Sequence, residues 1–400
     1  MPADESSITR HAGAEVGADP SELTELGTPA NLLTRPGPVV FYRCPAAGAL
    51  RKHVIESNLA VAKELAAFMG RPFNGEFNAR HTYPGPLYFV PSESLLSADS
   101  RRLGIRGDRQ LFGGVVPFPF VATKVISHSL ATADSAAPIG WSAKFPAHVA
   151  RVVLPGFSAF TRADASRAGL RLLDAGAVRI KRANGVGGLG QWVARDRREL
   201  ASALDTVDAG ELEREGIVLE RNLAEPRTCS VGQVRVDDTT ISYCGTQRLT
   251  RSNDGQQVYG GSDLRVVRGG WDRLLALEPE PQFRTAIAQA RVYHDAAMSI
   301  FGMFASRCNY DVAQGLDGTG NWHSGVLEQS WRVGGASAAE VAALHAFRSD
   351  CELQVVRAST TEVYGTTPDV PADATVYFQG DDKHAGPITK FARIRLNGHS

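Results

Sequence analysis

The sequence predicts an α/β protein with an N-terminal open-sheet domain, a small α+β subdomain and a C-terminal antiparallel sheet. Three observations favour this fold class. A strand-helix-strand order occupies residues 39–103, a glycine-rich loop follows an apolar strand near Lys181, and a later hairpin has an acidic residue on each strand. The 400 residues, 43% of them hydrophobic, are enough for several packed subdomains.

Composition and charge exclude some classes of partner. Formal net charge is zero at pH 7, so charge gives no argument for nucleic acid or for an anionic membrane surface. No stretch reaches the roughly 20 apolar residues that span a bilayer, and the first residues lack a secretion signal. The five cysteines share no metal-ligand spacing and indicate reduced thiols. We therefore expect a cytoplasmic protein without nucleic-acid or membrane partners, and a homodimer is left open.

The first part of the chain predicts a leader followed by an open sheet. Residues 1–38 are rich in Ala, Glu, Gly, Thr and Pro, bury little, and are expected to be mobile. Residues 39–43 read as a strand, and residues 53–68 have apolar positions at helical spacing. Residues 86–91 read as a second strand. This order predicts an open-sheet domain over residues 39–123.

The middle of the chain contains a loop that predicts a phosphate site. Lys181 ends an apolar strand, and the following loop contains Gly185, Gly187, Gly188 and Gly190. Glycine tolerates positive φ and lets backbone N–H groups turn toward an anion. The loop also matches G-x-G-x-x-G, but a dinucleotide site needs a helix directly after the glycines. Residues 191–194 come first and the next helix start is Asp196, so the glycines predict a strand-loop-strand hairpin.

A second hairpin predicts a metal site. Strands over residues 309–313 and 325–332 flank a turn rich in Gly and Asp, with Asp311 on one strand and Glu328 on the other. Carboxylates on adjacent strands can jointly hold Mg²⁺, which keeps several waters and binds phosphate oxygens, and an arrangement of two metals that bridge one triphosphate is left open. Together with the glycine loop, this hairpin predicts a phosphate clamp, as in a nucleotide site.

These motifs in this order resemble the ATP-grasp superfamily, in its biotin-carboxylase-like branch, and within that branch a proteobacterial group. The most specific match is the family's hinge, in which a glutamate is followed after two residues by leucine and then by Pro-Arg, as in residues 216–227. The resemblance implies ATP with Mg²⁺ or Mn²⁺. It implies that Lys124 and Lys181 contact the phosphates, and that Glu220 and the backbone of Arg221 and Leu223 meet the adenine.

The same resemblance assigns roles in the metal hairpin. The family ends this hairpin in E-x-N-x-R, and here the residues are Glu328, Ser330 and Arg332. Asp311, Glu328 and Ser330 would be the metal ligands, with Ser330 ligating only weakly or through water because it replaces asparagine. Arg332 and Lys181 would be catalytic, since a guanidinium matches the oxygens of a transferring phosphoryl group.

The resemblance also divides the rest of the chain. It gives a lid at 124–220, a metal-binding subdomain at 221–350 and a C-terminal extension packed on the core at 351–400. Residues 259–264 are expected to form a polar glycine-rich loop that faces the acceptor substrate, with Gln247 and Arg248 as contacts. Biotin carboxylases place a lysine for bicarbonate after this pair, and none follows here, which argues against bicarbonate and biotin.

The implied activity is that of an ATP-grasp carboxylate ligase. A small-molecule carboxylate would be activated as an acyl phosphate and then attacked by an amine or a similar nucleophile. One alternative is a nucleotide-binding regulatory or scaffold module without turnover, because Ser330 weakens the predicted metal site. A second alternative is an oxidoreductase that uses the G-x-G-x-x-G motif, and the strand after the glycines argues against it.

Overall fold

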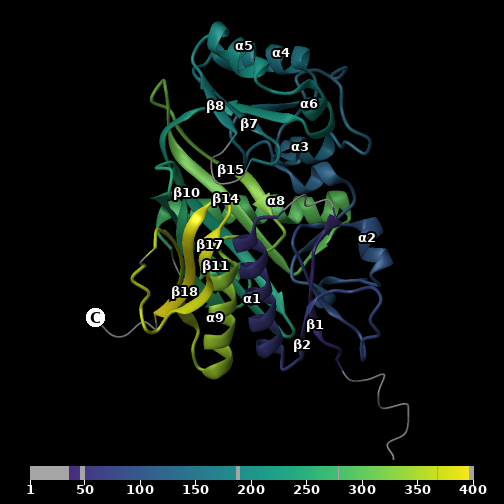
Figure 1. Ribbon diagram of the computed structural model, residues 1–400. Helices are drawn as coiled ribbons and strands as arrows, with labels where there is room; N and C mark the ends of the chain where they lie inside the picture. The colour runs from purple at the N-terminus through teal and green to yellow at the C-terminus, as the bar shows by residue number, and fades with distance from the viewer. Residues whose placement is uncertain (1–35, 46–49, 186–189, 278, 367, 396–400) are drawn as a thin grey trace, which may run out of the picture.

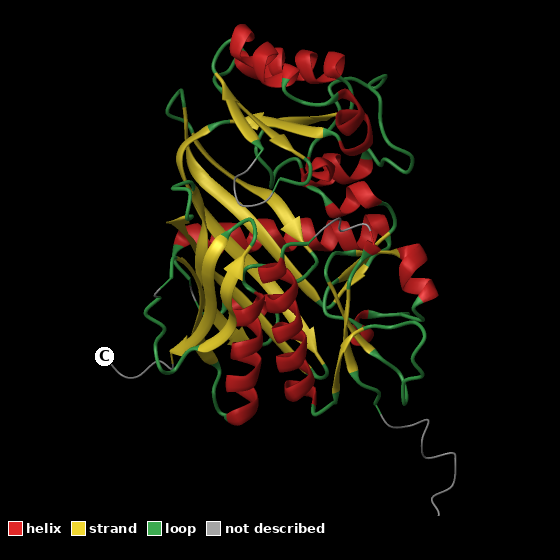
Figure 2. Cartoon of the chain, viewed as in Figure 1, coloured by secondary structure: helices red, strands yellow, loops and turns green. Residues whose placement is uncertain are grey.

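The predicted α/β class is confirmed by the structure, a computed structural model with several sheets and one large antiparallel sheet (Figures 1 and 2). The structure describes residues 36–45, 50–185, 190–277, 279–366 and 368–395. Most of the predicted mobile leader lies outside the described residues. In Figure 1 the lid is at the top, the N-terminal domain is at the lower right, and the large sheet lies at the centre and left.

The N-terminal domain has the predicted strand-helix-strand order. Strands β1 (Val39–Tyr42) and β3 (Tyr88–Pro91) are parallel neighbours, and α1 (Lys52–Met69) connects them through the unpredicted β2 (Phe73–Glu76). A second small sheet joins this domain to a later part of the chain. It contains β4 (Leu95–Leu96), β5 (Gly114–Val116) and β13 (Phe304–Ala305). Helix α2 (Ser97–Arg102) and the short helix η3 (Asp108–Gln110) lie between β4 and β5 in the chain, and the short helices η4 (Pro119–Ala122) and η5 (Lys124–Ser127) follow β5.

The lid is a four-stranded antiparallel sheet covered by helices. Its order is β6-β9-β7-β8, with β6 (Gly156–Ala159), β7 (Val178–Arg182), β8 (Gln191–Ala194) and β9 (Ile217–Arg221). Helices α4 (Arg162–Leu173) and α5 (Arg197–Asp205) pack on this sheet. The segment also contains α6 (Ala209–Glu215) and α3 (Lys144–Val149), and α3 packs against η5 and the central core instead. The pairing of β7 with β8 confirms the strand-loop-strand prediction. Asp196 caps α5, accepting the Glu199 N–H at 2.8 Å, so the helix starts beyond the second strand.

The large sheet has eight strands in the order β15-β14-β10-β11-β12-β16-β18-β17. They are β10 (Leu223–Val236), β11 (Thr239–Arg251), β12 (Gln257–Arg268), β14 (Arg307–Asp317), β15 (Trp322–Ser330), β16 (Val355–Tyr364), β17 (Thr375–Asp382) and β18 (Gly386–Arg395). The remaining helices are α7 (Trp271–Leu275), α8 (Pro281–Phe301) and α9 (Ser337–Ser349). The predicted loop at 259–264 is wrong, because these residues lie inside β12.

Two apolar cores hold the large sheet between helices. α8 packs on one face, where its Ile287 and Tyr293 meet Val231 and Val312 of the sheet. α1 and α9 pack on the other face, where residues such as Leu65 and Leu344 meet β11, β12 and β16. The predicted metal hairpin, β14–β15, is therefore packed against α8 and lies below the strands of the lid in the view of Figure 1. None of the helices in the described ranges is long and apolar enough to cross a membrane.

Candidate functional site

One buried lysine connects three separate parts of the predicted clamp. Lys124, in η5, is 5% exposed. Its Nζ donates to the Gly185 carbonyl at 2.7 Å and lies 2.8 Å from Glu328 Oε2. The start of the glycine loop, the first predicted phosphate-binding lysine and a predicted metal ligand therefore meet at one point.

The second predicted lysine forms a buried ion pair with the hinge glutamate. Lys181 Nζ lies 2.5 Å from Glu220 Oε1, and Glu220 is 1% exposed. The pair forms because β7 and β9 are antiparallel neighbours. Arg179 is opposite Glu220, and Lys181, two residues further along β7, lies on the same face of the sheet as Arg179 and reaches Glu220 diagonally. Burial opposes ionisation of Glu220, but Lys181 and then His128 lower its pKa to about 2. Glu220 is therefore charged in the folded protein.

His128 is a member of this cluster that the sequence did not indicate. It is buried, its Nε2 lies 3.5 Å from Glu220 Oε2, and neither atom has a hydrogen-bond partner among the described residues. Its position in the sequence shows no ligand spacing, so only the packing of η5 against the lid reveals the contact.

The glycine loop is described at its two ends. Gly190 has φ of 70°, the positive value predicted for this loop, and its carbonyl accepts the Arg182 N–H at 3.0 Å. Gly185 donates its N–H to the Arg182 carbonyl at 3.3 Å. Gly187 and Gly188 lie outside the described residues.

The two predicted metal acids lie directly opposite each other on β14 and β15. Asp311 pairs with Glu328 in the strand register. Asp311 Oδ1 accepts hydrogen bonds from Gln247 Nε2 at 2.8 Å and Asn309 Nδ2 at 3.0 Å, and Ser230 Oγ lies 3.4 Å away. Burial and then the neighbouring Glu328 carboxylate raise the pKa of Asp311 to about 6.

This donor set fits a divalent cation. Two carboxylates at short range repel each other, and a cation between them would offset the repulsion. No group of three or more His, Cys, Asp or Glu side chains surrounds a common point in the described ranges. Phosphate oxygens and water would therefore complete the coordination of Mg²⁺, as is usual for this ion.

The third predicted ligand, Ser330, is held by a buried arginine. Arg307 Nη1 donates to Ser330 Oγ at 3.1 Å and to the Arg332 carbonyl at 2.7 Å. Arg307 is 1% exposed and forms an ion pair with Glu340, which is 0% exposed, at 2.8 Å. Neither Arg307 nor Glu340 was indicated by the sequence, because their contact joins β14 to α9.

Arg332, the predicted phosphoryl contact, has a partner in the N-terminal domain. Its Nε lies 3.0 Å from Glu93 Oε2. Burial raises the pKa of Glu93, while the Arg332 guanidinium lowers it. Arg332 thus lies where the loop after β3 meets the end of the metal hairpin.

The two predicted substrate contacts point in different directions. Gln247 reaches the metal acid Asp311, as described above. Arg248 Nε donates to Asp263 Oδ2 at 2.6 Å and its Nη2 donates to the Thr360 carbonyl at 2.8 Å. Successive side chains of a strand point to opposite faces of the sheet. The structure therefore brings Gln247 to the site and does not bring Arg248 there.

The hinge residue Leu223 belongs to a small, mostly buried apolar cluster. Leu223 forms a small cluster with Leu154, Ala313 and the half-buried Leu327. The side chain of Arg221 is fixed by Asp317, with Nη1 2.8 Å from Oδ2. Of the predicted adenine contacts, Arg221 is therefore held by an ion pair and Leu223 by apolar packing.

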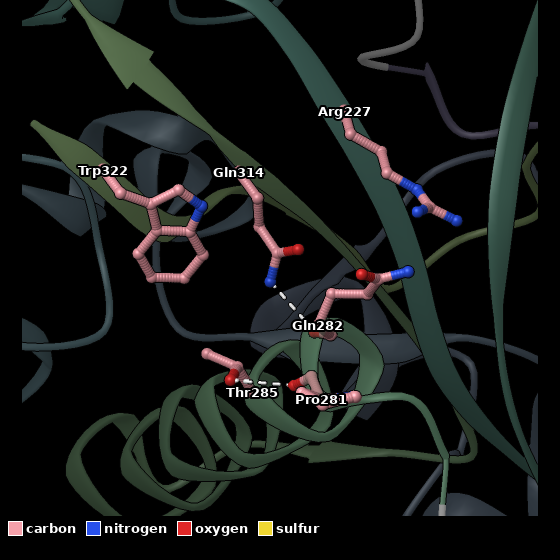
Figure 3. Close-up of a pocket in the computed structure, with 6 residues that line it drawn as sticks. All are labelled: Arg227, Pro281, Gln282, Thr285, Gln314 and Trp322. Carbon is pink, nitrogen blue, oxygen red and sulfur yellow. Dashed lines mark hydrogen bonds between the residues drawn. The ribbon is translucent and has the colours of Figure 1, made fainter. Parts of the chain in front are cut away.

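A cavity of about 370 Å³ lies on the α8 face of the sheet (Figure 3). Its lining residues are Arg227, Pro281, Gln282, Thr285, Gln314 and Trp322. Gln314 Nε2 donates to the Gln282 carbonyl at 2.9 Å, and the Arg227 guanidinium lies 5.2 Å from the Phe283 ring centroid. None of the predicted site residues lines this cavity.

Comparison with solved structures identifies the fold. The chain is similar to an N5-carboxyaminoimidazole synthetase from Staphylococcus aureus complexed with ADP, at 10% identity and a TM-score of 0.52, covering 91% of this chain and 95% of that one. It is also similar to a biotin carboxylase from Campylobacter jejuni in a β-γ-ATP complex, at 11% identity and a TM-score of 0.51, covering 90% of this chain and 87% of that one. The fold is thus the predicted ATP-grasp fold of the biotin-carboxylase-like kind.

Sequence comparison assigns the family. No curated protein matches the sequence. A family model described as a protein of unknown function, DUF3182, matches residues 41–392. The chain therefore belongs to the DUF3182 family.

Proposed function

We propose that the protein is an ATP- and Mg²⁺-dependent ligase that activates a small-molecule carboxylate as an acyl phosphate for attack by an amine or similar nucleophile. The observation that carries the proposal is the contact of Lys124 with both the Gly185 carbonyl and Glu328. A buried ammonium at the junction of a glycine loop and a carboxylate pair suits a triphosphate with its cation. The ATP-grasp fold supports this interpretation.

Nucleotide binding would use groups that are already charged and buried. Lys124 and Lys181 now offset the charges of Glu328 and Glu220, and both ammonium groups would also offset phosphate charge. The apolar cluster around Leu223 and Leu327 would contact the adenine ring. Because Arg221 is anchored by Asp317, its backbone would be a fixed contact for the adenine edge.

The proposed chemistry proceeds by two displacements. A carboxylate oxygen of the substrate bonds to the γ-phosphorus while the bond from that phosphorus to the bridging oxygen breaks, and ADP leaves. The nucleophile then bonds to the acyl carbon, phosphate leaves with its bond electrons, and the nucleophile loses a proton. Arg332 would exchange Glu93 for the transferring phosphoryl group. Bound Mg²⁺ would reduce the charge of the β and γ oxygens, with Asp311 and Glu328 as protein ligands.

A nucleotide-binding module without turnover is the second candidate. The observation that favours it is Ser330, which stands where a stronger ligand is expected and is hydrogen-bonded by Arg307. The two candidates differ in one readout. A ligase releases ADP when a suitable carboxylate and amine are added, whereas the module binds ATP and releases none with any pair.

The first experiment is calorimetric titration of ATP, with and without Mg²⁺, and with NADH as the control ligand. Lys124→Met is the informative variant, because Glu328 is 38% exposed and tolerates the loss of its partner. We expect Mg²⁺-dependent binding that the variant weakens by more than about tenfold, or 1.4 kcal/mol. Lys390→Met is the matched control, since Lys390 is a largely covered lysine paired with Glu362, on strands β18 and β16. Equal ATP binding by wild type and Lys124→Met, or binding of NADH instead, would contradict the proposal.

A further inference from the structure

We infer that the site holds a single divalent cation with its nucleotide. A second cation would need Ser330 as a ligand, and the guanidinium of Arg307 already binds Ser330. The inference rests on the proposed nucleotide site. It differs from a two-metal arrangement, in which the hairpin supplies ligands for two ions. Three observations support it.

The first observation is the state of Ser330. Arg307 Nη1 donates to both the side-chain oxygen and the carbonyl of Ser330, at 3.1 and 3.2 Å. One lone pair of the hydroxyl oxygen is therefore used. A divalent cation on the remaining lone pair would sit within a few ångströms of a guanidinium, and charges of the same sign repel strongly at that range.

The second observation is that Arg307 is fixed. Its Nε donates to the two Glu340 oxygens at 3.2 and 3.1 Å, and its Nη2 donates to Glu340 Oε1 at 2.8 Å. Tyr243 Oη donates to the same carboxylate at 2.6 Å. Both members of the ion pair are almost completely buried, so separating them to admit a metal would leave an unpaired buried charge.

The third observation is the number of carboxylate oxygens left for a metal. Oδ1 of Asp311 already accepts hydrogen bonds from two amides, and Oε2 of Glu328 contacts the Lys124 ammonium. In the part of the chain that the structure describes, this leaves Oδ2 of Asp311 and Oε1 of Glu328 without partners. Two protein oxygens, together with phosphate oxygens and waters, suit one octahedral Mg²⁺.

The test counts bound Mn²⁺ by the electron paramagnetic resonance signal of the free ion, using the full chain saturated with a non-hydrolysable ATP analogue. We expect one Mn²⁺ per bound nucleotide. Ser330→Ala should bind the same number with an affinity within about twofold, because Ser330 is not a ligand. Glu328→Gln should lose Mn²⁺ binding by more than tenfold. Two Mn²⁺ per nucleotide in the wild type, or a tenfold loss in Ser330→Ala, would overturn the inference.

A triple variant tests the role of Arg307 itself. Arg307→Met, Glu340→Leu and Ser330→Asn together remove both buried charges and install an amide ligand, and we expect a second Mn²⁺ to bind. Circular dichroism establishes that the variant is folded, and a folded variant that still binds one ion would refute the role of Arg307. If the wild type binds nucleotide but takes two ions, only the inference fails. If it binds no nucleotide, the proposed function fails with it.

Discussion

The buried Lys181–Glu220 pair allows stability and nucleotide binding to be separated by mutation. Lys181→Met removes one charge and leaves Glu220, which is 1% exposed, with His128 as its remaining ion-pair partner among the residues that the structure describes. The fall in the Glu220 pKa from 4.5 to about 2 corresponds to about 3 kcal/mol of stabilisation, and breaking a buried pair typically costs about 3–5 kcal/mol. We therefore expect Lys181→Met to lose about 3 kcal/mol of unfolding free energy at pH 7.

The double variant Lys181→Met/Glu220→Leu should lose much less than the single variant. It replaces the ion pair by apolar side chains in a buried position, which is often close to neutral. Urea unfolding followed by circular dichroism measures the free energies, and the double-mutant cycle should give a coupling of at least about 2 kcal/mol. The double variant should nevertheless fail to bind ATP in the calorimeter. If the double variant loses as much stability as Lys181→Met and Glu220→Leu together, the two effects are additive and the pair is not coupled as the structure indicates.

The pH dependence of the same pair follows from the sign of the shift. Because the folded-state pKa of Glu220 lies below its unfolded value, its stabilisation is complete above about pH 4.5 and is lost as pH falls toward 2. Glu220→Gln should flatten this part of the stability profile, measured by urea unfolding at stepped pH. A profile that keeps its wild-type slope in Glu220→Gln would contradict the assignment.

Three further predictions concern other parts of the molecule. Burial and then Lys390 lower the pKa of His53 to about 4. The unfolding free energy should therefore be unaffected by His53 above about pH 6.5 and should fall by about 3 kcal/mol as the pH is lowered toward 4. Urea unfolding at stepped pH should show this loss in the wild type and not in His53→Leu. Gly114→Ala should cost about 1–3 kcal/mol in thermal or urea unfolding, because its Cβ would lie 2.8 Å from Trp331 Cβ, and an unchanged stability would refute that close contact. Asp317→Ala should cost about 1.5–3 kcal/mol and weaken ATP binding in the calorimeter, because it releases the Arg221 guanidinium, whereas equal binding would show that the hinge does not depend on this anchor.

Local patterns in the sequence predict the two hairpins that form the site. The apolar strand at Lys181, the capping pair at Asp196 and the acids at 311 and 328 each depend on residues close together in the chain. Predictions from such signals agree with the structure because turns and helix caps are determined by local interactions. The hinge strand before Leu223 was identified differently, by the resemblance of residues 216–227 to the family pattern.

Contacts between distant strands were not predictable. Lys181 and Glu220 are both assigned to the nucleotide site by resemblance, but only the pairing of β7 with β9 brings them into contact with each other. Arg307 shows no signal of its own, because its partner Glu340 lies on helix α9, beyond the next strand of the chain. Pairings of this kind depend on the order of strands in a sheet, which a single sequence does not state.

The glycines of β12 show how a local rule can mislead. Residues 259–264 were expected to form a loop because of their glycines, yet they form a continuous strand. A Cβ at Gly261 would lie 2.1 Å from the Thr360 carbonyl of β16, and a Cβ at Gly245 would lie 1.9 Å from the Asp263 carbonyl. Glycine is needed there because neighbouring backbones approach closely and because Gly261, next to a register shift between β11 and β12, has a φ of 138°.

The contacts between α1, near the N-terminus, and β17, near the C-terminus, have a consequence for how the chain folds during synthesis. The His53 N–H donates to Asp382 Oδ2 at 3.1 Å, and these two residues are 329 positions apart. The core that α1 shares with α9, β12 and β16 therefore stays incomplete until strands β16 to β18 leave the ribosome. Until then, one edge of β12 lacks its partner strand β16, and the apolar side chains of α1 are exposed to water. We expect nascent chains that stop before β16 to need chaperones, although they already contain every residue assigned to the nucleotide site.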